Sequence, residues 1–371
     1  MEKILFVATV DEHIRHFHYP FLEWFKNRGY EVHVASKGEE DLEFVDKKYN
    51  IPFEKSPFSL SNLRAYNDLK RLIKENDYKL VHCHTPVGGV MARLASIPER
   101  KRGLRVVYTA HGFHFYKGAP KKNWILYYPV EKFLSRFTDV LILINEEDYN
   151  LALNKRFKAE KIEHVRGVGV NFDKFIPQAP YLKQSIRKKH SYSDDDFILV
   201  YVGELRYRKN QELLIKVIEK TKNDIPNIKL LLVGDGDLYS YYYELIKSLD
   251  LDKNIELLGY RKDVPELMLL SDIVVSSALQ EGLPVNVMEA MATGLALIVS
   301  NCRGNRDLVI NGENGFVFEI DDIDRIKSAL IELYKDKELM LKFGQDSLNK
   351  VKQYNIKTVL SKMEDIYLSL L

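Results

Sequence analysis

The chain has 371 residues, of which 46% are hydrophobic and 29% charged, and its formal net charge is +2. Protein domains usually have about 100 to 200 residues, so this length predicts two domains. This composition excludes disordered, collagen-like and mucin-like chains. The net charge is too small to indicate nucleic acid, so we expect no nucleic-acid partner.

The cysteines and the N-terminus indicate a reducing compartment without a leader segment. Cys83 and Cys302 lie in different halves of the chain, so we expect no structural disulfide and a cytoplasmic location. The N-terminal MEKILFVATVDEHIRHF has a seven-residue apolar run that continues into charged sequence, which predicts a buried first strand and not a signal peptide. No stretch reaches the roughly 18 consecutive apolar residues of a membrane span, so any membrane contact is expected to be peripheral.

Short apolar or β-branched runs alternate with helical patterns from end to end. Such runs suit parallel strands buried on both faces, with the helices as crossovers. The predicted strands are Lys3–Thr9, Glu31–Ser36, Lys79–His84, Arg105–His111, Asp139–Asn145 and His164–Val170, then Phe197–Gly203, Lys229–Gly234, Ile255–Tyr260, Asp272–Ser277, Ala296–Asn301 and Phe316–Glu319. The pattern predicts an α/β fold of two doubly wound, Rossmann-like domains facing a central cleft.

Residues 176–195 mix prolines, charges and serines without apolar periodicity, which predicts a boundary and a hinge. We therefore expect a first domain over 1–185 and a second over 186–354. The helical spacing of 355–371 predicts a last helix that packs back on the first domain. Ligands of open α/β sheets bind outside the carboxyl ends of the strands, so we expect the chemistry in the cleft.

The strand DIVVSSA is followed by LQEGLPVNVME. Proline is favoured at the first helical position, so we predict a helix that begins at Leu283 or Pro284 and ends before Gly294. The free amide groups near Val285 and Asn286, together with the helix dipole, form a site for an anion.

Two glutamates, Glu281 and Glu289, flank this predicted anion site. Ionised carboxylates only accept hydrogen bonds and suit pairs of hydroxyl groups. A ligand with a diphosphate in its middle and a hydroxyl-bearing ring at each end fits this spacing, which indicates a nucleotide sugar. The alternative for either residue alone is a solvent-facing or dipole-favoured helix glutamate.

The loop after the strand Phe197–Gly203 carries Arg206, Arg208 and Lys209. Guanidinium groups bind phosphate in a bidentate manner, and lysine adds a point charge. We expect this loop to face the cleft and bind the diphosphate, with a solvated basic loop as the alternative.

Several histidines are candidates for the first domain's part of the cleft. His111 ends the strand RVVYTAH, and Gly112 after it permits close backbone approach. The others expected at the same cleft are His114, His82, His84, His13, His16 and His18. No compact Cys/His pattern with zinc spacing is present, and His13, His16 and His18 would converge only if they lay on a helix. The Asp-rich segments SDDD and GDGD lie in the predicted linker and at a turn. We predict no metal site.

Residues 111–134 interleave aromatic and basic side chains, an arrangement typical of the interface of an anionic bilayer. The aromatic residues are Phe113, Phe115, Tyr116, Trp124, Tyr127 and Tyr128, and the lysines are Lys117, Lys121 and Lys122. The alternative is that the rings belong to the core and the lysines to a solvated face.

The segment EGLPVNVMEAMATGLALIVSN resembles the signature of the retaining, family 4 glycosyltransferases of the GT-B fold. The segments GELRYRKNQELLIKVI, LLLVGDGD, DVPELMLLSDIVVSSA and SNCRGNRDLVINGENGFV follow the same family's order. The segments TAHGFHFYKGAPKKNWILYYPVEKFL, TDVLILINEEDY and RGVGVNFDKF are similar to the subgroup that assembles exopolysaccharide, capsule and lipid-linked glycans. The resemblance thus covers most of the chain.

This resemblance implies roles for individual residues. The implied catalytic residues are His111, Glu281 and Lys209. The implied donor-binding residues are Arg206, Arg208, Lys209, Glu281, Gly282, Leu283, Pro284, Val285, Asn286 and Glu289, and the acceptor-side residues are His13, His16, His84 and His114. Many family members have arginine directly after the glycine where this chain has Glu204, which leaves the diphosphate-binding arginine open between Arg208 and Arg206, with Arg208 favoured.

The resemblance also implies a reaction. A hexose or N-acetylhexosamine would move, with retained configuration, from a UDP-linked donor to a polyprenyl-diphosphate-linked glycan at the inner face of the cell membrane. No cofactor or divalent metal is expected, because basic groups and the helix terminus would neutralise the diphosphate. A sugar-nucleotide epimerase and a non-catalytic nucleotide-sugar-binding subunit stay open as alternatives. A nicotinamide dehydrogenase is excluded because the turn ATVDEHIRHF lacks glycine.

Overall fold

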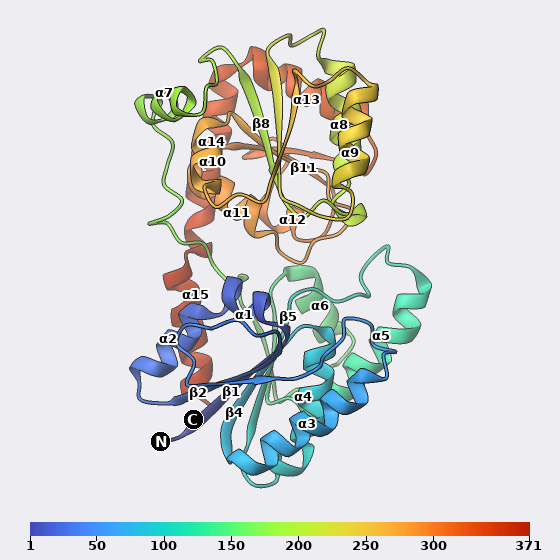
Figure 1. Ribbon diagram of the computed structural model, residues 1–371, viewed down its shortest axis with the longest axis vertical. Helices are drawn as coiled ribbons and strands as arrows, with labels where there is room; N and C mark the ends of the chain where they lie inside the picture. The colour runs from blue at the N-terminus through green and yellow to red at the C-terminus, as the bar shows by residue number, and fades with distance from the viewer. The chain divides into compact units, whose positions relative to one another are not determined.

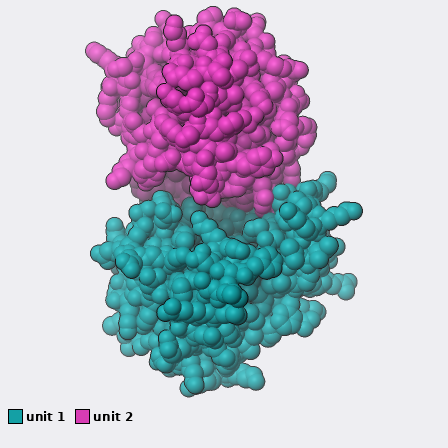
Figure 2. Space-filling model, turned by 45° about the vertical axis from the view of Figure 1, so that its right-hand side comes forward, with its two compact units in different colours: residues 1–168, 357–371 teal, residues 169–356 magenta.

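A computed structural model describes all residues, 1–371, and the chain forms two compact units (Figure 2). Unit 1 comprises Met1–Val168 and Lys357–Leu371, and unit 2 comprises Gly169–Ile356. Each unit contains an all-parallel sheet with helices on both faces. The chain therefore has the two doubly wound α/β halves that the strand pattern predicted.

Unit 1 contains a seven-stranded sheet in the order β3-β2-β1-β4-β5-β6-β7 (Figure 1). Its strands are β1 (Lys3–Val10), β2 (Glu31–Lys37), β3 (Lys47–Asn50), β4 (Tyr78–His84), β5 (Arg105–Ala110), β6 (Val140–Leu143) and β7 (Lys161–His164). The strand order reverses between β1 and β4. In sheets of this kind that reversal opens a crevice at the carboxyl ends of the two strands.

Three parts of this sheet differ from the sequence prediction. The strand predicted at Asp139–Asn145 is shorter, since β6 spans Val140–Leu143. Strand β3 was not predicted, because KKYN is a short and polar edge strand without an apolar run. The last strand was predicted at His164–Val170, which was wrong, since β7 ends at His164. Gly167 and Gly169 have positive φ angles of 74° and 80°, so the backbone after β7 turns and leaves the extended conformation.

The helices of unit 1 cover both faces of its sheet (Figure 1). Helices α3 and α4 pack on one face and α2 and α15 on the other. The bounds are α1 (Asp11–Phe17), α2 (Tyr19–Asn27), α3 (Ser61–Asn76), α4 (Pro86–Arg100), α5 (Lys121–Leu134), η1 (Ser135–Phe137), α6 (Glu146–Asn154) and α15 (Ile356–Leu368). No helix is both long enough and apolar enough to cross a membrane.

Unit 2 contains a six-stranded sheet in the order β10-β9-β8-β11-β12-β13. Its strands are β8 (Phe197–Val202), β9 (Ile228–Val233), β10 (Ile255–Gly259), β11 (Ile273–Ser276), β12 (Ala296–Ser300) and β13 (Gly315–Phe318). All six were predicted within one residue at either end. The strand order reverses between β8 and β11, which again opens a crevice at their carboxyl ends.

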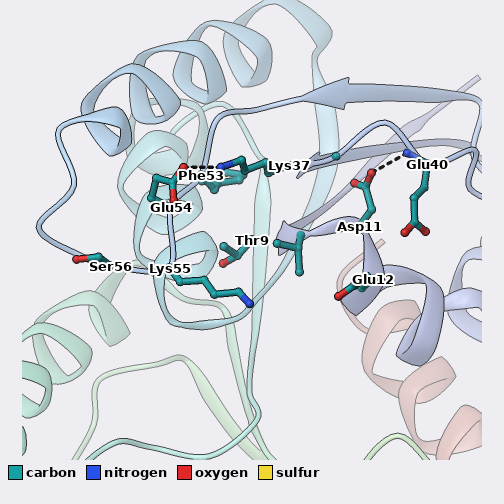
Figure 3. Close-up of a pocket in the computed structure, with 11 residues that line it drawn as sticks. Thr9, Asp11, Glu12, Lys37, Glu40, Phe53, Glu54, Lys55 and Ser56 are labelled. Atoms are coloured by element: carbon teal, nitrogen blue, oxygen red, sulfur yellow. Dashed lines mark hydrogen bonds and ion pairs between the residues drawn. The ribbon is translucent and has the colours of Figure 1, made fainter. Parts of the chain in front are cut away.

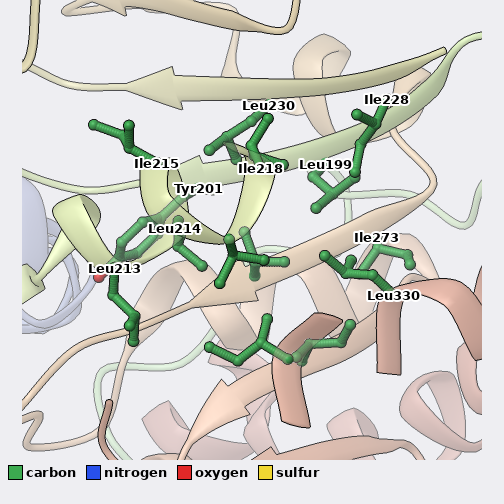
Figure 4. Close-up of a cluster of buried hydrophobic side chains, with 14 of the residues drawn as sticks. Leu199, Tyr201, Leu213, Leu214, Ile215, Ile218, Ile228, Leu230, Ile273 and Leu330 are labelled. Carbon is green, nitrogen blue, oxygen red and sulfur yellow. The ribbon is translucent and has the colours of Figure 1, made fainter. Parts of the chain in front are cut away.

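The helices of unit 2 surround this sheet, and one core cluster includes hydrophobic side chains of β8, β9, β11, α8 and α13 (Figure 4). The bounds are α7 (Pro180–Lys189), η2 (Tyr207–Lys209), α8 (Gln211–Thr221), α9 (Tyr239–Ser248), α10 (Val264–Leu270), α11 (Val285–Thr293), α12 (Asn305–Leu308), α13 (Ile323–Lys335), α14 (Lys337–Val351) and η3 (Lys352–Tyr354). The continuous apolar runs of the strands explain why both faces of the sheet are covered.

Helix α7 lies within the segment that the sequence assigned to a linker. Lys183 and Arg187 both form ion pairs with Asp272, at 2.6 and 2.8 Å. Arg187 also donates to the carbonyl of Leu270 at 2.9 Å. The sequence placed the domain boundary at 185/186, whereas residues 169–185 belong to unit 2, because these long-range polar contacts tie α7 to α10 and β11.

Helix α15 belongs to unit 1, where its apolar face is part of the core. Val359, Met363 and Ile366 are buried there, and the Tyr367 hydroxyl lies 2.8 Å from Nδ1 of His82. The spacing i, i+4, i+7 puts these apolar side chains on one face. Cys83 and Cys302 are both free and buried.

Candidate active site

The candidate site residues of unit 2 follow β8 and β11, the two strands at the point where the strand order reverses. The loop after β8 contains Lys209, and the loop after β11 contains Glu281. Gly234, after β9, comes so close to the first of these loops that a Cβ atom on it would lie 2.2 Å from the carbonyl oxygen of Gly203. Three loops therefore meet at one edge of the sheet.

The backbone of Lys209 is fixed by hydrogen bonds from residues in or next to two neighbouring strands. It ends the short helix η2, and Asn210 after it adopts the left-handed conformation with φ of 53°. The Lys209 carbonyl accepts hydrogen bonds from the Tyr201 hydroxyl at 3.0 Å and from the Ser277 hydroxyl at 3.1 Å. Residues from β8 and from the end of β11 thus fix where the lysine side chain begins.

The side chain of Lys209 makes an ion pair with Glu281. Its Nζ donates to Oε1 at 2.5 Å, and Nη1 of Arg208 lies 3.6 Å from Oε2. Lys209 and Glu281 are each 8% exposed, and Nε of Arg303 donates to the Glu281 carbonyl at 3.1 Å. Buried charges require such pairing, so the acid and the bases of this site support one another.

Arg206 lies outside this cluster. Its Nε forms an ion pair with Glu204 at 2.7 Å and a looser one with Asp237 at 3.8 Å. The sequence left open which arginine belongs to the site, with Arg208 favoured. In the structure Arg208 lies beside Glu281, and the unusual Glu204 takes up the charge of Arg206.

Helix α11 begins at Val285, with Pro284 as its N-cap residue. The sequence predicted a start at Leu283 or Pro284, which was too early, because Pro284 has an extended ψ of 117°. No side chain caps the first turn, so its amide groups are available to an anion. The Asn286 side chain donates to the carbonyl of Val202 at 2.7 Å, which ties this turn to the end of β8.

Glu289 lies one turn further along α11 and is partly buried. Burial raises the pKa of its carboxyl group to about 8, against the lowering effect of Lys174. Gly294 ends the helix in the left-handed conformation with φ of 79°, as the sequence predicted.

In unit 1, four histidines converge at the carboxyl ends of β1, β4 and β5. His13 is on α1, His18 joins α1 to α2, His84 ends β4 and His111 follows β5. Their ring nitrogens lie within 4.8 Å of one another. The sequence placed all four at one cleft, but it showed no metal-ligand spacing, because they come from three separate segments.

The remaining candidate histidines lie elsewhere in unit 1. His16 is exposed, and its Nδ1 lies 2.7 Å from the carbonyl of Glu12. His82 is bonded at both nitrogens, to Tyr367 and Thr109, each at 2.8 Å. His114 stacks on Tyr127 with a centroid distance of 4.6 Å.

Unit 1 contains an apolar pocket lined by His13 and His114 and, next to it, a smaller charged pocket. The larger, of about 700 Å³, is mostly apolar and is lined by Thr9, Val10, His13, Lys55, Pro57, Phe58, Thr85, Pro86, Val87, Val90, Met91, His114, Leu126, Tyr127, Val130 and Glu131. The smaller, of about 470 Å³, is charged and is drawn in Figure 3. Lys55 lines both pockets. Sequence reasoning missed Lys55 because it lies in a loop without a motif.

The rings of segment 111–134 are mostly directed inward. Phe113 and Phe115 are buried, and Trp124, Tyr127 and Tyr128 pack against the same core. The side chains that are exposed on α5 are instead Ile125, Leu126, Val130 and Phe133, with Lys121 and Lys122 at its start. At 100° per residue these four apolar side chains share one face of the helix, so the exposed set differs from the aromatic residues that the sequence indicated.

Comparisons with known proteins agree with this architecture. Residues 183–350 match the family of glycosyl transferases group 1, and residues 3–145 match a family of glycosyl transferase 4-like domains. EpsD of Bacillus subtilis strain 168, named as a glycosyltransferase, is 44% identical over 366 residues, which are 99% of this chain and 96% of EpsD.

Two further proteins are similar over most or all of their lengths. The Escherichia coli UDP-Gal:alpha-D-GlcNAc-diphosphoundecaprenol alpha-1,3-galactosyltransferase is 32% identical over 319 residues, 84% of this chain and 80% of that enzyme. The crystal structure of Anabaena Alr3699/HepE in complex with UDP and glucose matches with a TM-score of 0.81 and 19% identity, over the full length of both chains. The chain therefore belongs to the group 1, GT4-like glycosyltransferases and has their two-domain GT-B fold.

Proposed function

We propose that this glycosyltransferase moves a hexose or N-acetylhexosamine, with retained anomeric configuration, from a UDP-linked donor to a glycan on polyprenyl diphosphate. The proposed setting is the assembly of cell-surface polysaccharide. The single observation that carries the proposal is the buried Lys209–Glu281 pair, whose glutamate lies four residues before Val285, where the uncapped helix α11 begins. It combines a cation and an anion-binding helix end with an acid that can accept from sugar hydroxyls.

The relatives support the choice of donor and acceptor. The Escherichia coli enzyme is named for a UDP-sugar donor and a diphosphoundecaprenol acceptor, and the Anabaena structure was determined with UDP and glucose. The same chemistry in this chain would require a diphosphate site between two hydroxyl-binding acids. Unit 2 has residues of these types in Arg208, Lys209, Glu281 and Glu289.

On the donor side, Arg208, Lys209 and the amide groups of Val285 and Asn286 would bind the diphosphate. Glu289 would accept from the ribose hydroxyls, and Glu281 from those of the sugar. Donors fixed before the reaction stabilise the charge that develops on the departing UDP without reorganisation. The proposed transfer needs no divalent metal, because these cationic and amide groups supply the positive charge.

The bond from C1 of the sugar to the donor phosphate breaks while a bond from the acceptor oxygen to C1 forms on the same face. The acceptor hydroxyl proton passes to the departing phosphate oxygen, so no protein nucleophile is required. We assign to His111 of unit 1 the role of orienting the transferred sugar.

We propose unit 1 as the acceptor-binding unit. Its apolar pocket suits the first isoprene groups of a polyprenyl chain, since it is lined by Phe58, Leu126 and Val130. Lys55 lines both the apolar and the charged pocket, where it would neutralise the acceptor's own diphosphate. His13, His84 and His114 would then lie on the side of the acceptor sugar.

We also propose peripheral contact with the inner face of the cell membrane through α5. Ile125 is 72% and Phe133 50% exposed, on the same face as Leu126 and Val130. Lys117, Lys121 and Lys122 precede this face in the chain. An apolar stripe beside lysines suits an anionic bilayer, because the stripe enters the acyl boundary while the lysines reach the headgroups.

The transferase function is tested by incubating the protein with a panel of nucleotide sugars and a polyprenyl-diphosphate-linked sugar and identifying the products by mass spectrometry. We expect one donor to give a lengthened lipid-linked glycan. Glu281→Gln should lower kcat by about 100-fold or more, as the loss of a preorganised transition-state group does, while UDP still binds. Glu204→Gln, a change in the neighbouring loop, is the control and should keep near wild-type turnover.

Three outcomes would contradict the proposal. Isomerisation of the nucleotide sugar without acceptor would indicate an epimerase. Tight UDP binding without any turnover would indicate a binding subunit. Wild-type turnover of Glu281→Gln would remove the assigned role of that residue.

Membrane contact is tested by sedimentation with anionic liposomes. We expect the wild type in the pellet, and Ile125→Ser/Phe133→Ser or the triple change of Lys117, Lys121 and Lys122 to Glu mainly in the supernatant. Leu341→Ser, which alters a 70% exposed leucine on α14, should leave binding unchanged. Equal recovery of all variants in the supernatant would argue against the contact.

A further inference from the structure

The four-histidine cluster of unit 1 has the composition of a metal site. Its members His13, His18, His84 and His111 each offer a ring nitrogen, and these atoms lie within 4.8 Å of one another. Imidazole nitrogen is a common ligand of Zn²⁺, Cu²⁺ and Ni²⁺. No carboxylate or thiol belongs to the cluster.

Two of the distances between the ring nitrogens match the ligand spacing around a tetrahedral ion. Nε2 of His111 lies 3.3 Å from Nε2 of His13 and 3.4 Å from Nδ1 of His84. A tetrahedral zinc with bonds of about 2.0–2.1 Å separates its ligand nitrogens by about 3.3–3.4 Å.

Two of the histidines also lack partners that the fold would otherwise provide. His18 is 1% exposed, and neither of its ring nitrogens has a hydrogen bond. His84 is equally buried, and its Nε2 has no partner. Its ring stacks on that of His18 at a centroid distance of 3.8 Å. Buried polar atoms are nearly always bonded, so the two unbonded nitrogens of His18 point to a missing ligand, whereas His84 would bind through Nδ1, the atom that lies 3.4 Å from His111.

The neighbouring His82 shows how this fold satisfies a histidine that needs no ligand. It is just as buried, yet Tyr367 and Thr109 occupy both of its nitrogens at 2.8 Å. His82 and His84 lie on the same strand, yet only His84 has an unbonded nitrogen. The unbonded ring nitrogens of His84 and of the neighbouring His18 are therefore specific to the cluster.

We propose that His13, His18, His84 and His111 bind one transition-metal ion, with Zn²⁺ as the leading candidate. His13 lines the apolar pocket, which gives the ion a path of entry. An occupied site would hold His111 by its Nε2 and so withdraw it from the transferred sugar. This inhibition rests on the proposed function, whereas the binding itself does not.

A second group, His190, Asp263 and Glu266, also has ligand-forming atoms within 4.8 Å of one another. Its members are already paired, because Glu266 binds Lys189 at 2.7 Å and Asp263 binds Arg261 at 2.5 Å. This group therefore serves as an internal control.

The test uses full-length protein without a histidine tag, freed of metal by a chelator and titrated with ZnCl₂ in a calorimeter. We expect one equivalent to bind, with at least tenfold weaker binding in His18→Gln and in His84→Gln. His16→Ala, on the same helix as His13, and Glu266→Gln should bind as the wild type does. Circular dichroism of the metal-free variants checks their folding.

A Co²⁺ titration of the wild type keeps the test decisive if the variants fail to fold. Intense visible absorption is expected from tetrahedral nitrogen ligation, and weak bands indicate open, octahedral coordination. The proposal is overturned by a wild type that binds no ion, by weak octahedral bands, by unchanged binding in folded His18→Gln and His84→Gln, or by a loss of binding in Glu266→Gln.

Discussion

Lys209 illustrates how one buried residue can serve both the stability and the chemistry of the site. Its acidic partner is Glu281, and both side chains are largely excluded from water. Removal of one member of a buried pair leaves an uncompensated charge and typically costs about 3–5 kcal/mol. Variants of Lys209 and of Glu281 therefore need a check of folding by circular dichroism beside the activity, and Arg208 gives a cleaner test because its side chain is half exposed.

Separate substitution of Arg208 and Arg206 distinguishes the arginine beside Glu281 from the one outside the site. Arg208→Ala should weaken UDP binding by about 10- to 100-fold, because a hydrogen bond to a charged group contributes about 1.5–3 kcal/mol. Arg206→Ala should change it less than about twofold, since exposed pairs such as the one with Glu204 contribute little. Calorimetry with UDP measures both, and equal losses would contradict the assignment of Arg208.

The pH dependence of nucleotide binding should depend on Glu289. Its carboxyl has a pKa raised to about 8 by burial, so it is protonated at neutral pH and ionises as the pH rises. The ionised form accepts with both oxygens and suits the two ribose hydroxyls better than the protonated form, which uses one oxygen as a donor, so we expect UDP affinity to increase between about pH 7 and 9 and then level off. In Glu289→Gln this increase should be absent, as calorimetry across that range would reveal.

At the scale of elements, the position of the loop after β8 depends on two glycines whose backbone lies very close to it. Gly234 and Gly236 after β9 have φ angles of 143° and 158°. A Cβ atom on Gly236 would lie 2.5 Å from the carbonyl oxygen of Leu205, so both glycines pack against the loop that leads to Lys209. The segment GDGD is therefore part of the scaffold for the basic loop.

Gly234→Ala should push the loop after β8 away from its position. We expect a loss of more than about 1 kcal/mol of unfolding free energy, together with weaker UDP binding. Gly259→Ala is the matched control, because Gly259 has φ of 62° but no atom within 4 Å of an added Cβ. Chemical denaturation and UDP titration of both variants test this, and unchanged UDP binding in Gly234→Ala would contradict it.

At the scale of the whole molecule, the chain returns to its first unit. Residues 169–356 form unit 2, and α15 then completes the core of unit 1. The folding of unit 1 consequently requires residues from both ends of the chain. A substitution in α15 should therefore lower the stability of unit 1, most of which is formed by the N-terminal half of the chain.

Met363→Ala should destabilise unit 1 by about 2–5 kcal/mol, since Met363 is 4% exposed in its core. Amide hydrogen exchange should accelerate throughout unit 1 and stay unchanged in unit 2. Leu368→Ala, on the same helix but 56% exposed, should cost less than about 0.5 kcal/mol. Faster exchange confined to unit 2 would contradict the assignment of α15 to unit 1.

The sequence alone was sufficient for the features that are local in the chain. Apolar runs predicted nearly all strands, and EGLPVNVME predicted an acid, a helix start and a second acid, because strand period, proline position and helix rise act over a few residues. The predicted start of α11 was one or two residues too early, because the ψ angle of Pro284 cannot be read from the residue type.

Only the tertiary structure decided which distant residues meet. The sequence placed His13, His84 and His111 at one cleft, but only the order of β1, β4 and β5 in the sheet brings their ring nitrogens within 4.8 Å of one another. Folding of the loop after β3 carries Lys55 to the pockets. The inward rotation of α5 selected Ile125 over Trp124 for exposure. These outcomes follow from strand order and helix packing, which join segments that share no local pattern, so the chain's periodicity could not predict them.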